Sequence, residues 1–171
     1  MDKIMILGNS GSGKSTLARN MGEILDIEPT HLDALHWLPG WVESTREHKV
    51  ELLAPVLERD RWIVDGTYRK VLWQERLADA DTIICLDINR FRRLYQAFKR
   101  SRIYKGKTRP DMGEGCEEKF DFEFVKWILF SSKRRKKNLE VMELLKNNGK
   151  DTYIFKNRRQ INKFLEGLKQ L

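Results

Sequence analysis

The chain has 171 residues, of which 40% are hydrophobic and 34% charged, and its formal net charge is +8. This length suits one α/β domain with a sizeable core and is too short for two ordinary ones. No apolar run approaches the roughly 20 residues that a membrane-spanning helix needs, and the chain starts with a strand-like run rather than a signal peptide. We therefore expect a cytoplasmic protein without a membrane partner, either a monomer or a homodimer.

The positive charge is concentrated in one segment. Residues 89–110 contain nine Lys or Arg residues and no acid, so the rest of the chain is close to neutral. Such a segment is typical of a solvated basic face that attracts nucleic acid, or of an element that closes over an anionic ligand. A second cluster, Lys133–Lys137, is interpreted as a solvated helix face.

A phosphate-binding loop is predicted near the start of the chain. The apolar run at residues 4–7 leads into Gly8-x-x-x-x-Gly13-Lys14-Ser15, the P-loop pattern between a strand and a helix. Glycines let successive backbone N–H groups turn toward phosphate oxygens. Lys14 would reach the β- and γ-phosphates, and the Ser15 hydroxyl would bind Mg²⁺. The expected nucleotide-binding residues are Gly8, Ser10, Gly11, Ser12, Gly13, Lys14, Ser15 and Thr16.

Hydrophobic spacing predicts a helix from Lys14 to Leu25 and a short strand from Pro29 to Leu32 that ends at Asp33. Residues 34–41 lack a sustained period and are expected to form a loop. Its tryptophans, Trp37 and Trp41, either line a pocket or cover the core.

The middle of the chain continues the alternation of helices and strands. A capping box at Ser44 predicts a helix that Pro55 kinks or divides. A strand over 61–64 ends in Asp65-Gly66, a helix follows over 68–78, and the strand over 82–86 ends at Asp87. We expect Asp87 to cap the next helix.

The last third begins with a basic helix over 91–101. Residues 102–118 contain four Gly or Pro residues and no period, which is typical of a long mobile loop that is either functional or disordered. A long helix is predicted over 121–147, with a break near Ser131 and Ser132. A strand over 152–155 and a helix capped by Asn157 complete the chain.

Strands that alternate with helices predict an α/β fold with a five-stranded parallel sheet and helices on both faces. Ligands bind such sheets at the carboxyl ends of the strands. Those ends are Gly8, Asp33, Asp65 and Asp87. Three acids and the phosphate loop should therefore lie on one edge.

Two of these acids are candidates for phosphoryl-transfer chemistry. Asp65 follows a buried strand, where an acid that holds Mg²⁺ directly or through water is expected, although it could also only tighten the Asp-Gly turn. Asp33 could orient or deprotonate an acceptor hydroxyl, or simply cap a helix or loop. The sequence does not separate these roles.

Arginines of the basic segment are candidates for a lid. Arg100, Arg102 and Arg109 could fold over a triphosphate, stabilise the transferring group and exclude water. The loop that directly follows the basic helix favours this interpretation over a nucleic-acid-binding face.

Over nearly its whole length the chain resembles the adenylate kinase-like group of P-loop kinases. WIVDGTYR over 62–69 is similar to the Asp-Gly-Phe-Pro-Arg element of that group, and TRPDM over 108–112 to the Arg-x-Asp-Asp of its lid. HLDALHWLPGW, WIVDGTY and KTRPDMGEGCEE together resemble a subgroup known as DNA topology modulation proteins. The resemblance implies one P-loop kinase domain over 1–171, strand order 2-3-1-4-5, a substrate-binding insert at about 33–60 and a lid at about 100–118.

The resemblance also implies an acceptor site. Asp33, Trp37 and Asp65 would contact the acceptor, and Arg46 with Arg69 could clamp an acceptor phosphate. The leading hypothesis is a kinase that uses ATP and Mg²⁺ to phosphorylate a small nucleoside- or nucleotide-like molecule. The alternative is a nucleic-acid-associated regulator that binds nucleotide. A GTPase switch is disfavoured because the chain contains no Asp-x-x-Gly.

Overall fold

The sheet at the centre of the molecule is organised around strand β1 (Lys3–Gly8), which is buried along most of its length. The computed structural model describes residues 1–118 and 120–170. Strand β1 pairs in parallel with β5 (Trp62–Asp65) on one side and β6 (Thr82–Leu86) on the other. The outer strands are β2 (Pro29–His31), beside β5, and β7 (Asp151–Phe155), beside β6. The order β2-β5-β1-β6-β7 confirms the predicted order 2-3-1-4-5, counted along the chain.

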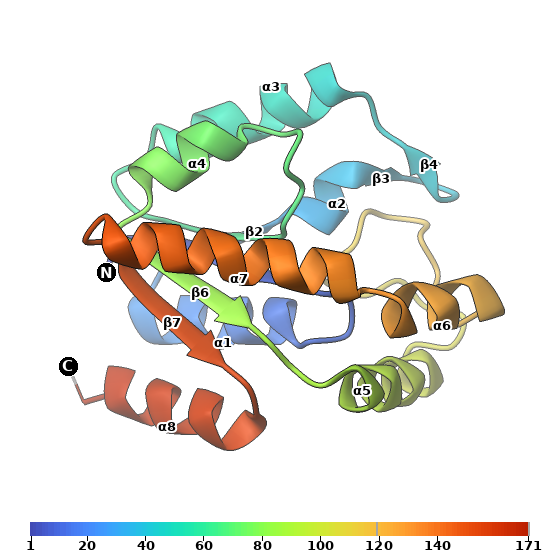
Figure 1. The fold of residues 1–171 in the computed structure, drawn as a ribbon. Helices are drawn as coiled ribbons and strands as arrows, with labels where there is room; N and C mark the ends of the chain where they lie inside the picture. The colour runs from blue at the N-terminus through green and yellow to red at the C-terminus, as the bar shows by residue number, and fades with distance from the viewer. Residues whose placement is uncertain (119, 171) are drawn as a thin grey trace.

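Helices cover both faces of this sheet and make a three-layer molecule (Figure 1). One face carries α1 (Lys14–Leu25) and α8 (Arg158–Leu168). The other carries α3 (Arg46–Leu57), α4 (Trp73–Asp79) and α7 (Ser132–Asn147). Side chains of β1 alternate between the two cores: Ile4 and Ile6 pack with α1 and α8, and Met5 and Leu7 pack on the opposite side. A parallel strand buried on both faces explains the continuous apolar run before the P-loop.

The remaining elements lie beyond the carboxyl ends of the strands, at the right of Figure 1. They are helix α2 (Leu32–His36), the antiparallel hairpin of β3 (Trp37–Leu38) and β4 (Val42–Glu43), and helices α5 (Arg90–Ile103) and α6 (Phe122–Leu129). Among the described residues, no helix is both long and apolar enough to cross a membrane.

Residues 34–41 were expected to be a loop, and this prediction is wrong. They contain most of α2 and the strand β3, and Asp33 lies inside α2 rather than at the end of β2. The hairpin follows from a tight turn at Gly40 and Trp41, which both have positive φ, at 78° and 66°. A periodicity search cannot detect a five-residue helix and two-residue strands.

The predicted helix over 121–147 is divided as expected, into α6 and α7, and Asn157 caps α8 by accepting a hydrogen bond from the Gln160 N–H. Two predicted caps are wrong. Thr45, not Ser44, caps α3, because the Ser44 hydroxyl donates to the Leu35 carbonyl at 2.6 Å. Asn89 caps α5, while Asp87 accepts two hydrogen bonds from Arg135 on α7.

The helix predicted over 68–78 begins only at Trp73, and the reason is a buried arginine. Arg76 has no exposed surface, and its guanidinium donates to backbone carbonyls that include those of Gly66, Tyr68 and Val71. Burial lowers the pKa of Arg76 to about 10, so the group remains charged at neutral pH. These bonds hold residues 66–72 in a compact loop that carries Tyr68, whose hydroxyl bonds to Asp33.

Candidate functional site

The loop from Gly8 to Thr16 joins β1 to α1 and has the backbone of a phosphate-binding nest. Gly8, Gly11 and Gly13 all have positive φ, at 150°, 75° and 94°. A Cβ on Gly11 would lie 2.6 Å from the Arg93 carbonyl oxygen, so this glycine is required by packing as well as by its backbone conformation. A Cβ on Gly13 would meet no atom closer than 3.9 Å, so this side of the loop is open. Helix α1 begins at Lys14 and directs its positive dipole end to the same place.

A buried arginine holds this loop against the last third of the chain. Arg93 of α5 donates to the Ser10 carbonyl at 3.3 Å, to the Ile128 carbonyl at 3.2 Å and to the Ser131 hydroxyl at 2.7 Å. Because the three acceptors come from the P-loop, α6 and the α6–α7 junction, Arg93 fixes their relative positions.

Asp65 lies at the end of β5 and is 4% exposed. Its Oδ2 atom is 2.9 Å from His31 Nδ1 at the end of β2, which places the two neighbouring strand ends in direct contact. The Oδ1 atom of Asp65 is buried and has no hydrogen-bond partner among the described residues. Such an orphaned carboxylate oxygen is costly unless a ligand, ion or water satisfies it.

Asp111, from the long loop between α5 and α6, lies over the start of α1. It accepts hydrogen bonds from Arg19 at 3.0 Å and from Arg109 at 2.8 Å, and it lies near the Ser15 hydroxyl. Burial alone would raise the pKa of Asp111, but Arg109, Ser15 and Arg19 more than offset it, so the pKa lies below its usual value. A charged carboxylate from the loop therefore lies beside the hydroxyl expected to bind Mg²⁺.

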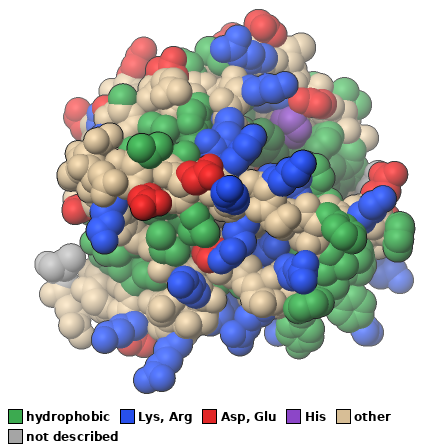
Figure 2. Space-filling view, in the orientation of Figure 1, with side chains coloured by type: hydrophobic (Ala, Val, Ile, Leu, Met, Phe, Trp, Pro, Cys, Tyr) green, Lys and Arg blue, Asp and Glu red, His purple; other side chains and the backbone are tan. Residues whose placement is uncertain are grey.

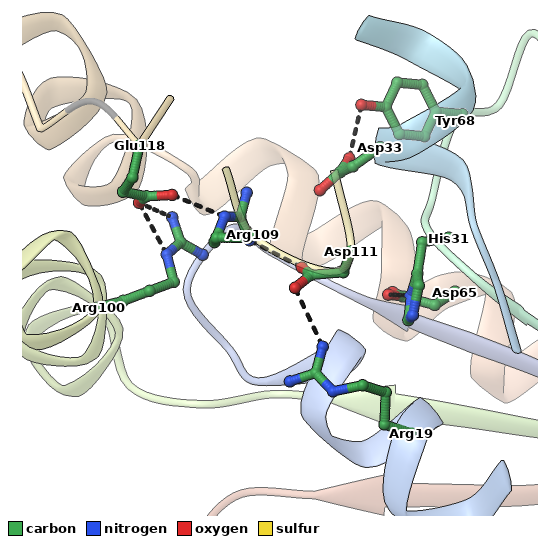
Figure 3. A network of polar contacts seen from close by, with 9 residues as sticks. All are labelled: Arg19, His31, Asp33, Asp65, Tyr68, Arg100, Arg109, Asp111 and Glu118. Atoms are coloured by element: carbon green, nitrogen blue, oxygen red, sulfur yellow. Dashed lines mark hydrogen bonds and ion pairs between the residues drawn. The ribbon is translucent and has the colours of Figure 1, made fainter. Parts of the chain in front are cut away.

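Glu118 joins two of the predicted arginines. Its carboxylate is 2.8 Å from Arg100 Nε and 2.6 Å from Arg109 Nε, and its side chain is 2% exposed. Figure 3 shows the resulting chain of ion pairs, from Arg100 through Glu118, Arg109 and Asp111 to Arg19. Buried acids thus hold two guanidinium groups side by side, on the side of the long loop that faces the P-loop. Burial, followed by repulsion from Arg109, lowers the pKa of Arg100.

Asp33 belongs to a second polar group, on α2. Its Oδ1 atom accepts a 2.7 Å hydrogen bond from the Tyr68 hydroxyl. Burial, with added repulsion from Asp33, raises the pKa of Tyr68 far above its usual value, so the phenol keeps its proton. The Tyr68 ring lies 4.6 Å from the His36 ring, which in turn meets Trp37 at 4.6 Å.

The long loop is attached to the β3–β4 hairpin by several bonds. The Gly40 N–H donates to the Gly115 carbonyl, the Trp41 indole to the Glu117 carbonyl, and the Cys116 thiol to the Leu38 carbonyl. Gly113 packs so closely that a Cβ there would lie 2.2 Å from the Trp37 carbonyl oxygen. The loop, predicted as mobile, therefore lies across both the P-loop and the hairpin.

The structure brings most of the predicted site residues to one edge of the sheet. Figure 3 shows Asp33, Asp65, Arg100 and Arg109 around a common space, with the start of α1 below them. Three predicted residues lie elsewhere. Arg46 donates to the Lys70 carbonyl, Arg69 stacks 4.4 Å from the Trp73 ring and bonds to α7, and Arg102 lies exposed on α5 beside Phe98.

Sequence reasoning gave no role to several residues of this site. The missed residues are Arg19, His31, Tyr68, Arg93, Asp111 and Glu118. Arg19 lies four residues after Ser15 on α1, so helical spacing could have placed it above the P-loop. For Arg93 and Glu118 the chain carries no local signal, because their partners are distant in sequence.

Comparison with known proteins gives a fold but no relative in sequence. No family model matches the chain, and no curated protein matches it. Among solved structures, shikimate kinase from Acinetobacter baumannii in complex with shikimate is 13% identical, with a TM-score of 0.54 over 99% of this chain and 92% of that one. Shikimate kinase from Bacteroides thetaiotaomicron is 18% identical, with a TM-score of 0.55 over 98% of this chain and 96% of that one.

Deoxyadenosine kinase from M. mycoides with products dCMP and a flexible dCDP bound is 16% identical, with a TM-score of 0.42 over 98% of this chain and 99% of that one. The two shikimate kinases match along nearly the whole chain at low identity. This chain therefore has the three-layer α/β fold of these P-loop kinases.

Proposed function

We propose that the protein transfers a phosphoryl group from ATP, with Mg²⁺, to a small nucleoside- or nucleotide-like acceptor. The observation that carries this proposal is the group around Ser15. There a phosphate-binding loop, the buried Asp65 and two acid-linked arginines meet at the carboxyl edge of one sheet. Phosphoryl transfer depends on positioning and on neutralising charge, and these residue types supply both. The resemblance to adenylate kinase-like enzymes agrees with this reading, whereas nothing in the fold or the comparisons points to the topology modulation subgroup.

The residues around Ser15 fit a magnesium ion. Mg²⁺ is usually held by one or two carboxylates, with water and phosphate oxygens as its other ligands. Asp65 offers a buried oxygen that has no hydrogen-bond partner within the described part of the chain, and Ser15 offers a hydroxyl. Among the described residues, no three His, Cys, Asp or Glu side chains could hold a metal on their own, which suits an ion that arrives with nucleotide. When bound, Mg²⁺ neutralises charge on the β- and γ-phosphate oxygens.

In this proposal the P-loop holds the donor, with Lys14 at the β- and γ-phosphates. Residues 100–118 act as a lid, whose Arg100 and Arg109 stabilise charge on the transferring group. The buried acids Asp111 and Glu118 orient the two inner arginines before nucleotide arrives. Such preorganised cations cost little rearrangement at the moment of transfer.

The acceptor lies in the proposed insert, residues 33–60, near Asp33 and Trp37. Asp33 either receives the acceptor proton or orients the hydroxyl, and Tyr68 fixes one of its oxygens. Attack by an acceptor hydroxyl forms a bond to the γ-phosphorus, breaks its bond to the bridging oxygen and releases ADP.

A second candidate, a nucleotide-binding regulator associated with nucleic acid, is favoured by the surface of α5. Figure 2 shows hydrophobic side chains gathered over α5 and α6, with Lys and Arg side chains around them. The exposed aromatic residues there include Phe91, Tyr95, Phe98, Trp127 and Phe130. However, Arg93, Arg100 and Arg109 are bound internally, which reduces the charge available to a polyanion. Retention on single-stranded DNA that falls steeply with salt would support this candidate.

The kinase proposal is tested by incubating the protein with Mg²⁺, ATP and a panel of nucleosides, nucleoside monophosphates and small alcohols. ADP and phosphorylated product are measured by chromatography. We expect at least one acceptor to yield both in equal amounts. If no acceptor yields ADP above the level of a Lys14→Ala variant, the kinase proposal fails.

A further inference from the structure

The wall of the site around Asp33 combines the Asp33 carboxylate with polar and aromatic side chains that carry no charge. The Tyr68 hydroxyl donates to Asp33 Oδ1 and stays protonated. Figure 3 shows the other carboxylate oxygen of Asp33 pointing away from Tyr68, toward the side where Arg109 and Asp111 lie. That oxygen is therefore placed to accept a hydrogen bond from an acceptor hydroxyl.

His36 is a neutral member of this wall. Lys49 Nζ lies 2.8 Å from His36 Nδ1, and an ammonium group can only donate, so Nδ1 accepts and the ring proton is on Nε2. Burial and the positive charge of Lys49 both lower the pKa of His36. With Trp37 and Tyr68, its ring forms a cluster of three half-buried rings, in which the His36 ring is inclined by 84° to Trp37 and by 45° to Tyr68. We name this cluster the aromatic wall.

Five described cations near the two halves of the site are already committed or turned away. Arg19 is bound by Asp111, Lys49 is 3.2 Å from Glu43, and Arg109, bound by Asp111, serves the transferring phosphoryl group in the proposal above. Arg46 and Arg69, which could have formed a phosphate clamp, instead bind the Lys70 carbonyl and α7. Both line a separate groove with Trp73 and Glu75, away from Asp33. A phosphate beside Asp33 would meet the like charge of its carboxylate, and none of these five described cations is placed as its dedicated counter-ion.

We infer that the acceptor is an uncharged hydroxyl compound with a flat ring, the chemical class of nucleosides, and not a nucleoside monophosphate. This inference rests on the proposed phosphoryl transfer and narrows its acceptor. The ring of the acceptor stacks on Trp37 of the aromatic wall, and the hydroxyl hydrogen-bonds to Asp33. In the transfer step the acceptor oxygen bonds to the γ-phosphorus, its proton passes to Asp33, and ADP leaves, so the products are a phosphate monoester and ADP.

The test compares each nucleoside with its own 5′-monophosphate, as acceptors for Mg²⁺ and ATP under identical conditions. We expect kcat/KM to be at least about tenfold higher for the nucleoside, because only the uncharged molecule fits beside Asp33. Turnover of the monophosphate at an equal or higher rate would overturn the inference and leave the kinase proposal standing. Turnover only of alcohols that lack a ring would overturn it too. Absence of transfer to every acceptor would instead remove the kinase proposal itself.

A Trp37→Leu variant tests the aromatic wall separately. We expect it to raise the KM for the nucleoside by about fivefold or more, while the KM for ATP and the melting temperature change little. The matched control is Tyr95→Leu, which removes an exposed ring from α5. If Trp37→Leu leaves the KM for the nucleoside at the control value, or raises both KM values together, a stacking role for Trp37 is excluded.

Discussion

The two halves of the candidate site are built in different ways. The nucleotide half uses a continuous stretch, residues 8–16, whose glycines and helix start define its shape locally. The acceptor half is assembled from distant segments: Asp33 binds Tyr68, which is 35 residues away, and the Leu38 carbonyl binds the Cys116 thiol, which is 78 residues away. Phosphate binding can therefore be predicted from one sequence motif. The choice of acceptor depends instead on contacts between helices, strands and loops that are distant in sequence.

The contact between the halves is the loop from Tyr104 to Glu118. Asp111 reaches the start of α1, and Gly113 and Gly115 reach the β3–β4 hairpin. One loop therefore touches the nucleotide half and the acceptor half together. Variants in each half and in this loop should therefore have separable effects on kcat, on ATP affinity and on kcat/KM for the acceptor.

The largest effect is expected in the nucleotide half, from Asp65→Asn. Asparagine can still bond to His31 but removes the negative charge, so kcat should fall on the order of a hundredfold and the Mg²⁺ concentration for half-maximal rate should rise. Steady-state rates over a Mg²⁺ titration measure both. Asp79→Asn is the control, because Asp79 pairs with Lys3 at the opposite end of the sheet. An unchanged Mg²⁺ dependence would show that Asp65 has only a structural role.

A somewhat smaller effect is expected from Arg109→Gln, in the loop. If this arginine stabilises the transferring group, kcat should fall roughly tenfold to a hundredfold, while the dissociation constant of ATP changes much less. The matched control is Arg92→Gln, an exposed arginine of α5. Equal losses in kcat and in ATP affinity would mean that Arg109 only binds ATP in the ground state.

Gly113→Ala tests the attachment of the loop to the hairpin. The added Cβ would lie 2.2 Å from the Trp37 carbonyl oxygen, so loop and hairpin must separate. We expect acceptor kcat/KM to fall about tenfold, since small misplacements of a reacting group are costly, with ATP affinity nearly unchanged. Gly167→Ala on α8, where a Cβ would meet nothing within 4 Å, is the control. Comparable kinetics in the two variants would contradict this role of the loop.

The smallest effect concerns acid stability. The pKa of Asp111 is lower in the folded protein than in an unfolded chain. Its contribution to stability is therefore present above the unfolded pKa of about 4 and is lost as the pH falls through the folded pKa. Urea unfolding from pH 7 to pH 3 should show that the gap in unfolding free energy between wild type and Asp111→Asn narrows below about pH 4. A gap that stays constant would contradict this assignment.

Much of the fold could be predicted because its signals are local. The buried runs at residues 4–7 and 82–86, and the stripe of Leu17, Ala18 and Met21, identify strands and a helix directly. The alternation of strands and helices was sufficient to predict a parallel sheet, and the resemblance to adenylate kinase-like enzymes supplied the strand order. The caps were less predictable: Ser44 and Asp87 have suitable side chains, but tertiary partners, the Leu35 carbonyl and Arg135, bind them first.

The candidate site was predictable only in part, for a related reason. Glycines and strand ends identified the P-loop and Asp65, because backbone geometry places them. Arg76 instead acts through backbone carbonyls of the loop that precedes its helix, and Arg93 through carbonyls of remote segments. No spacing rule shows which carbonyls will be near. Arg46 and Arg69 have the residue type of a phosphate clamp, yet a carbonyl and an aromatic ring hold them elsewhere.

The most direct test of the central claim is calorimetric titration of ATP, in the presence of Mg²⁺, into wild type and Lys14→Ala. If residues 8–16 hold the triphosphate, wild type binds ATP, and loss of the Lys14 charge weakens binding at least about tenfold. Asp33→Asn, in the acceptor half, should bind ATP as wild type does. Equal ATP affinity in wild type and Lys14→Ala, or no binding to wild type, would contradict the assignment of this loop as the nucleotide site.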